Sequence, residues 1–204
     1  MKAYQVVENG KPLEERDIET PSPQGNEVLL KTVACGVCHS DIHMARNEWG
    51  GSTIYPIVPG HEIIGVVSSV GPMVKKFKAG DDVGVGVYVD SCGHCQNCKN
   101  NLDHYCEKGI VLTYNSYEYG TRTITYGGYS KSIVVNQDYI VKIPQGMNKE
   151  KSAPLLCAGI TTYSPLKNFK IGSNHKVGIA GLGGLGHMGL KFALSFGANV
   201  TVFS

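Results

Sequence analysis

Four cysteines in the middle of the chain have the residue type and the spacing of metal ligands. Cys92, Cys95, Cys98 and Cys106 are separated by two, two and seven residues. Thiolates two residues apart can point at one centre when the turn between them is tight, and Gly93 gives this turn its backbone freedom. Four thiolates leave no open coordination position, so the spacing predicts a closed, structural zinc site. The alternative is a set of buried or disulfide-linked thiols.

A second group of ligand types is spread more widely along the chain. Cys38, His61 and Cys157 would give a zinc ion two sulfurs and one nitrogen and leave its fourth position open. An open position lets zinc bind an alcohol, lower its pKa and hold it as an alkoxide. The spacing only suggests this group, because Cys157 is distant in sequence and a lone histidine beside a strand is more often structural.

A glycine-rich loop, GLGGLG, occupies residues 181–186 between an apolar strand at 177–180 and a helix running through residue 195. In this setting Gly181 permits a tight turn, Gly183 lets the backbone approach a pyrophosphate, and Gly186 lets helix and strand pack closely. Gly184 and Leu185 open the helix, whose N-terminus favours phosphate charge. The loop therefore predicts a dinucleotide site, and the alternative is a structural turn without a ligand.

These residues must be positioned by two kinds of structure. Short β-branched runs broken by Gly, Pro and Asn, as at 27–33, 63–67 and 132–135, predict a barrel-like β domain over residues 1–150. The cysteine ladder interrupts it as a loop at 90–108. A helix over 154–166, the strand and helix around the glycine loop, and a strand at 199–203 predict the beginning of a Rossmann unit over residues 151–204. In the second helix, Leu185, Met188 and Phe192 fall on one predicted face, and Gly197 ends it.

Composition excludes several classes of function. The 204 residues are 42% hydrophobic and carry a formal charge of +2, which suits one large domain or one domain and part of another. Without a run of Lys or Arg, a nucleic-acid partner is not expected. No apolar stretch approaches the roughly 20 residues of a membrane span, so no membrane partner is expected either. The N-terminus has no apolar run like that of a signal peptide. We therefore expect the seven cysteines to stay reduced and the protein to lie in the cytoplasm.

The sequence Gly60-His61-Glu62, followed by Gly65, Gly71 and Val74, resembles the zinc signature of the medium-chain alcohol dehydrogenases. The cysteine ladder resembles their structural zinc lobe, and the glycine loop resembles their cofactor turn. Segments 35–41, 47–50, 126–130 and 154–159 resemble the cinnamyl alcohol dehydrogenase branch in particular. The resemblance covers essentially the whole chain. It implies a GroES-like, partly open β-barrel catalytic domain followed by the start of a Rossmann NAD(P)-binding domain.

Carried onto this sequence, the resemblance makes Cys38, His61 and Cys157 the ligands of a catalytic zinc. Glu62 adjoins the metal in this family and can replace water transiently, and the alternative for it is a buried acid bonded to a neighbouring arginine. Asp41 resembles the carboxylate that orients His61 through its other ring nitrogen.

The resemblance also implies a path for the substrate proton. Ser40 resembles the hydroxyl that takes this proton, and His43 resembles the residue that passes it to solvent through the nicotinamide ribose. His39 is expected near the cofactor pyrophosphate. Trp49 either lines an aromatic substrate pocket or belongs to the core. Cys35 is the thiol left over, and we expect it to behave as a small buried apolar residue.

The implied activity interconverts primary alcohols and aldehydes, of aromatic or cinnamyl type, with two zinc ions per chain and hydride transfer to or from NADP(H). NADP is favoured over NAD because Ser204, a small hydroxyl residue, lies near the position where NAD enzymes carry an acid. The alternatives are a polyol dehydrogenase of the same superfamily and a truncated, non-catalytic zinc-binding scaffold. The family's enzymes are longer homodimers, so we expect these residues alone to be unstable, inactive, or oligomeric through an open sheet edge.

Overall fold

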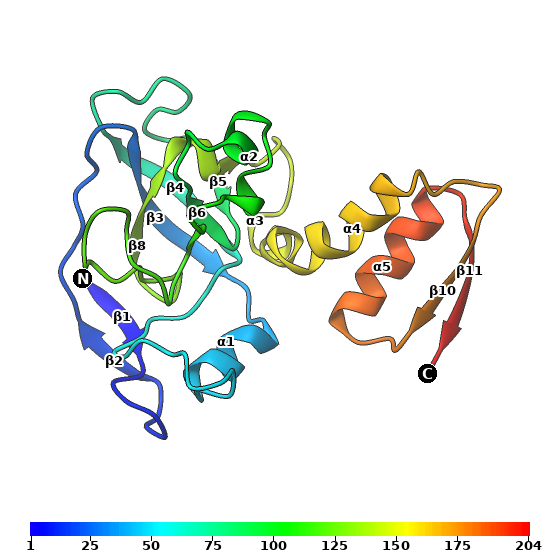
Figure 1. The fold of residues 1–204 in the computed structure, drawn as a ribbon, viewed down its shortest axis with the longest axis horizontal. Helices are drawn as coiled ribbons and strands as arrows, with labels where there is room; N and C mark the ends of the chain where they lie inside the picture. The colour runs from blue at the N-terminus through cyan, green and yellow to red at the C-terminus, as the bar shows by residue number, and fades with distance from the viewer. The chain divides into compact units, whose positions relative to one another are not determined.

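The computed structural model describes all 204 residues, which divide into two compact units, Met1–Ala153 and Pro154–Ser204. Figure 1 shows a β-rich first unit and a second unit of two strands with helices. No helix combines the length and the hydropathy that a membrane span requires. Each unit is described by itself.

A five-stranded antiparallel sheet forms the centre of the first unit, in the order β8-β3-β4-β5-β9 (Figure 1). Its strands are β3 Glu27–Cys35, β4 Ile63–Val70, β5 Asp82–Val85, β8 Ser132–Asn136 and β9 Ile140–Lys142. The β3–β4 pairing contains two register shifts, and such bulges bend and twist a sheet. Because β8 and β9 are the two edges and do not pair, the sheet curls without closing, as the barrel-like pattern predicted.

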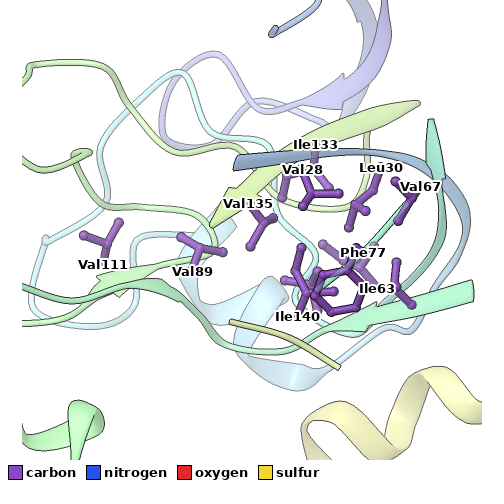
Figure 2. Packing of buried hydrophobic residues seen from close by; sticks show 12 residues of the cluster. Val28, Leu30, Ile63, Val67, Phe77, Val89, Val111, Ile133, Val135 and Ile140 are labelled. Atoms are coloured by element: carbon purple, nitrogen blue, oxygen red, sulfur yellow. The ribbon is translucent and has the colours of Figure 1, made fainter. Parts of the chain in front are cut away.

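The concave face of this sheet is the hydrophobic core (Figure 2). Alternate residues of a strand point to one face, so Val28 and Leu30 of β3 are both fully buried. Figure 2 also shows Phe77 among the strand residues, and Val89 and Val111 at one end of the cluster. Burial of each such side chain is worth about 1.5–3 kcal/mol, which holds the curled sheet in place.

Smaller elements surround the sheet. Two hairpins pair β1 Lys2–Gln5 with β2 Glu14–Asp17 and β6 Tyr88–Asp90 with β7 Val111–Leu112. The short helices are α1 His39–Ala45, α2 Gln96–Lys99, η1 Asp103–Tyr105, η2 Gln137–Tyr139 and α3 Lys149–Ser152. Helix α1 follows β3 directly, whereas α2 and η1 lie in the long β6–β7 connection that carries the cysteine ladder.

The second unit contains a parallel βαβ arrangement. Strands β10 Lys176–Ala180 and β11 Asn199–Phe203 pair in parallel, and α5 Gly184–Ser195 connects them. This is the start of the Rossmann fold that the glycine loop predicted. Gly197 ends α5 with a φ of 84°, and its N–H donates to the carbonyl of Leu194.

One detail of this unit differs from the sequence prediction. The helix expected over 154–166 is α4 Ala158–Asn168, preceded by the 3₁₀ turn η3 Ala153–Leu156, because Cys157 has the non-helical angles φ −127° and ψ −74°. In α5 the buried residue is Ala193, and Leu185 is 49% exposed.

Candidate metal centres and glycine loop

The four cysteines of the ladder converge on one point in the β6–β7 connection. Their sulfurs all lie within 4.8 Å of one another, and none of the chain's cysteines forms a disulfide. Gly93 has a φ of 69°, so the turn between Cys92 and Cys95 uses the left-handed conformation expected for it. Backbone N–H groups of Cys95 and Cys98 donate to the preceding ladder sulfurs at 3.4 and 3.5 Å. The arrangement is a closed four-sulfur site, and the disulfide alternative is wrong.

The electrostatics of the ladder fit a divalent cation. Burial opposes ionisation of Cys106, but hydrogen bonds from the Cys92 backbone and the Tyr119 hydroxyl lower its pKa to about 6. The Ser91 hydroxyl acts in the same sense at Cys98, yet burial and the neighbouring Cys95 raise the pKa of Cys98 to about 12. In this cluster the ionisation of one thiol therefore disfavours the ionisation of its neighbour. A zinc ion would stabilise all four thiolates together, so the donor set fits zinc.

Cys38 and His61 are brought together by two different elements of the first unit. Cys38 is the N-cap of α1, and His61 lies two residues before the start of β4. The ligand atoms of the two side chains lie within 4.8 Å of each other. Burial opposes ionisation of Cys38, but the backbone N–H and the hydroxyl of Ser40, with His61, lower the pKa of this thiol. Cys38 thus has the thiolate character of a metal ligand.

Asp41 fixes the orientation of the His61 ring. Its Oδ1 lies 3.0 Å from His61 Nδ1, and both side chains are buried. Because a carboxylate only accepts hydrogen bonds, Nδ1 must carry the proton, and Nε2 presents its lone pair as the metal ligand. Burial opposes the charge on Asp41, but the bond from His61 lowers its pKa, so the carboxylate is ionised at neutral pH.

Glu62 and Cys157 are the remaining predicted ligands. Glu62 is buried beside His61, and its carbonyl accepts a 2.9 Å hydrogen bond from the N–H of Gly36. Cys157 is half-buried in the second unit, where it precedes α4. The roles of both as zinc ligands remain predictions.

The predicted proton relay lies on α1. Ser40 contacts Cys38, and the rings of His39 and His43 stack with their centroids 4.7 Å apart. The ring of Trp49 also stacks on that of His43, with the ring centroids 5.5 Å apart, and the Trp49 side chain is 47% exposed. Its alternative role in the core is therefore wrong. The relay functions of Ser40 and His43 and the pyrophosphate contact of His39 remain predictions.

Sequence reasoning missed Glu48. Its Oε2 lies 2.5 Å from Nδ1 of His43, so the relay histidine has a carboxylate partner as His61 does. The sequence carried one signal for this pairing, because Glu48 follows His43 by five residues and lies just beyond the end of the short helix α1.

The glycine loop lies between β10 and α5. Gly181 has a φ of 81°, and a Cβ at Gly186 would lie 2.0 Å from the Gly181 carbonyl oxygen. Around Gly183 and Gly184 a Cβ would meet nothing within 4 Å, so this side of the loop leaves space for a ligand. Leu185 follows in the first turn of α5. The phosphate-binding roles of these residues remain predictions.

Comparison with known proteins places this geometry in a family. Residues 24–145 match the alcohol dehydrogenase GroES-like domain. The chain is 52% identical over 191 residues to the probable formaldehyde dehydrogenase AdhA of Bacillus subtilis (strain 168), covering 94% of this chain and 54% of that protein. It is 55% identical over 180 residues to a probable mannitol dehydrogenase of Medicago sativa, covering 88% of this chain and 49% of that protein.

A solved structure agrees with these relatives. The cinnamyl alcohol dehydrogenase of Helicobacter pylori, complexed with NADP(H), superposes with a TM-score of 0.93 at 44% identity, over all of this chain and 58% of that one. The chain therefore spans about half the length of the relatives that it matches.

Proposed function

Because the chain belongs to the zinc-type medium-chain alcohol dehydrogenases, in the cinnamyl alcohol dehydrogenase-like branch, we propose that it interconverts primary alcohols and aldehydes with NADP(H). The observation that carries this proposal is the set of buried groups around His61. Asp41 holds Nδ1 of that ring at 3.0 Å, which directs Nε2 toward the region of the Cys38 sulfur. Such a pairing of imidazole and thiolate suits a zinc ion that keeps an open position.

In the proposed site Cys38, His61 and Cys157 hold the catalytic zinc, and Glu62 is a transient fourth ligand. When bound, zinc supplies a Lewis acid that favours the deprotonated form of an alcohol. Ser40 accepts the substrate proton, and His43 passes it toward solvent, held by Glu48 at 2.5 Å. The four ladder cysteines hold a second, structural zinc.

The cofactor proposal rests on the glycine loop and on one relative. The open space at Gly183 and Gly184 would admit a pyrophosphate close to the backbone at the N-terminus of α5. The H. pylori relative was solved with NADP(H), which supports NADP over NAD. His39 would contact the pyrophosphate from the first unit.

Among the alcohols that the family's enzymes use, one class of substrate is favoured for this chain. The exposed Trp49 ring beside His43 favours an aromatic or cinnamyl-type alcohol, because it offers an apolar face next to the relay. A polyol is the second candidate, since the M. sativa relative is a probable mannitol dehydrogenase. Comparing cinnamyl alcohol, benzyl alcohol and mannitol as substrates would decide between them.

The decisive experiment uses the protein as its own cells make it, counts its zinc, and measures NADP(H)-dependent turnover of cinnamyl alcohol. We expect two zinc ions per wild-type chain. Cys157→Ala should lose turnover and one zinc, and the control Cys98→Ala should lose the other zinc. Loss of both ions from Cys157→Ala would contradict the division into two sites. Bound zinc without NADPH binding or turnover would favour the non-catalytic scaffold.

A further inference from the structure

The carboxylate that orients His61 is itself held by hydrogen bonds to both of its oxygens. Its Oδ1 accepts the Nδ1–H of His61 and the N–H of Gly60, both at 3.0 Å. Its Oδ2 accepts the N–H of Cys38 at 2.9 Å and the hydroxyl of Tyr129 at 3.2 Å. Tyr129 comes from a distant part of the chain, 88 residues after Asp41, and Tyr114 also bonds to this carboxylate.

The backbone around Tyr129 is fixed against the turn that carries His61. Gly127, Gly128 and Tyr129 each donate a backbone hydrogen bond to segment 58–60, at 2.8, 2.8 and 3.0 Å. The two segments touch so closely that a Cβ at Gly127 would lie 2.3 Å from the Gly60 carbonyl oxygen. A Cβ at Gly60 would lie 2.7 Å from the Tyr129 ring. The backbone of Tyr129 is therefore held by main-chain contacts that do not depend on its hydroxyl.

We propose that Tyr129 is a positioning residue for the catalytic zinc, acting through Asp41 on His61. This inference rests on the proposed function, because it assigns His61 as a zinc ligand. Without the Tyr129 hydroxyl, Oδ2 of Asp41 loses one of its hydrogen bonds, and the carboxylate gains freedom to turn. A turned carboxylate no longer holds the His61 ring in the orientation that presents Nε2 to the metal.

The test measures how fast zinc leaves the purified protein to an excess of a chromophoric chelator. Tyr129→Phe removes only the hydroxyl, and the three backbone bonds of segment 127–129 remain. The matched control is Tyr55→Phe, which removes another tyrosine hydroxyl near α1, one that donates to the Ala45 carbonyl at 2.9 Å and not to Asp41. The two zinc ions are expected to leave in separate kinetic phases. The Cys98→Ala protein, which lacks the ladder zinc, identifies the phase that belongs to the ladder.

We expect Tyr129→Phe to release the catalytic zinc about tenfold faster than wild type, in the range known for partners of metal-bound histidines. The ladder zinc and the Tyr55→Phe protein should release as wild type does. A cobalt-substituted Tyr129→Phe protein should also show shifted visible bands for the nitrogen-containing site. Equal release and equal bands in wild type and Tyr129→Phe would overturn the proposal.

A double-mutant cycle with Asp41→Asn tests the route of the effect. If Tyr129 acts through Asp41, Tyr129→Phe should change zinc release little in the Asp41→Asn background. Full additivity of the two effects would overturn the proposed route through Asp41. Wild-type protein that binds only the ladder zinc would contradict both this inference and the proposed function, whereas unchanged release from two zinc sites would contradict the inference alone.

Discussion

Gly36 leaves its side-chain space to the carboxylate of Glu62. A Cβ at residue 36 would lie 1.9 Å from Oε2 of Glu62, and the N–H of Gly36 donates to the Glu62 carbonyl at 2.9 Å. The segment between β3 and α1 thus contacts both the main chain and the side chain of Glu62, which follows His61. Because Gly36 does not have a positive φ, the contact with Glu62 is what requires a glycine here.

Gly36→Ala should therefore displace the Glu62 carboxylate without straining the backbone at residue 36. We expect the free energy of unfolding to fall by about 1–3 kcal/mol, as for other overpacked buried sites. Chemical denaturation of wild-type and variant protein measures this change. Gly172→Ala is the control, because a Cβ there would come no closer than 3.9 Å to a neighbour.

Shortening the acid tests whether Glu62 is the cause. Glu62→Asp removes one methylene, so the Gly36→Ala/Glu62→Asp protein should recover part of the stability that Gly36→Ala loses. A Gly36→Ala protein as stable as wild type would show that the carboxylate can move at no cost.

Two glycines of the cofactor loop should respond differently to the same substitution. A Cβ at Gly186 would lie 2.0 Å from the Gly181 carbonyl oxygen, whereas a Cβ at Gly183 would enter open space. Gly186→Ala should lower the free energy of unfolding by about 1–3 kcal/mol, because a backbone atom cannot give way easily. Gly183→Ala should leave stability nearly unchanged and weaken NADPH binding. Thermal unfolding and NADPH fluorescence titration separate the two effects, and a Gly183→Ala protein with wild-type NADPH affinity would count against the phosphate site.

The cysteine ladder and the glycine loop could be predicted from sequence because their geometry is local. In the ladder, ligands and turn lie within a short loop, so spacing alone indicates convergence. The curled sheet also followed from short β-branched runs with turn residues between them. Family resemblance, and not spacing, was needed to join Cys38 with His61, since 22 residues of chain lie between them.

Contacts that depend on tertiary structure were not predictable. The Tyr129–Asp41 hydrogen bond spans 88 residues, and no local pattern marks it. The apolar pattern grouped Leu185 with Met188 and Phe192 on one face of α5, but it did not single out Ala193, which is the buried residue of this helix. Small residues allow helix α5 to approach its neighbours closely, and this need for close approach does not appear in a hydrophobic periodicity.

Cys35 should resist alkylation although it lines a cavity. The thiol borders a space of about 490 Å³ together with Thr32 and Tyr129. Burial raises the pKa of Cys35 to about 12, so at pH 8 only about one thiol in 10⁴ is ionised and reactive. Iodoacetamide treatment of zinc-loaded protein, followed by peptide mass spectrometry, should leave Cys35 unmodified, whereas unfolded, zinc-free protein should be alkylated at all seven cysteines. Rapid modification of Cys35 in the folded protein would contradict the expectation.

The Glu48 carboxylate should matter for proton transfer and not for zinc. It lies 2.5 Å from Nδ1 of His43, so it accepts a hydrogen bond from Nδ1–H and leaves Nε2 as the nitrogen that can take a proton from the substrate side. Glu48→Gln removes the carboxylate that holds this tautomer. We expect kcat for alcohol oxidation to fall about tenfold, less than the roughly 10²–10⁴-fold contribution of a general base itself, with KM little changed.

Zinc content distinguishes this role from damage to the site, because Glu48 pairs with His43 and Arg46, which are not proposed zinc ligands. Glu48→Gln protein should keep two zinc ions per chain, and the control Glu8→Gln, which loses only a surface ion pair with Lys11, should keep full activity. If Glu48 acts through His43, a His43→Ala protein should lose no further activity when Glu48→Gln is added. A multiplicative loss in the double variant would mean that Glu48 acts on the substrate or cofactor by another route.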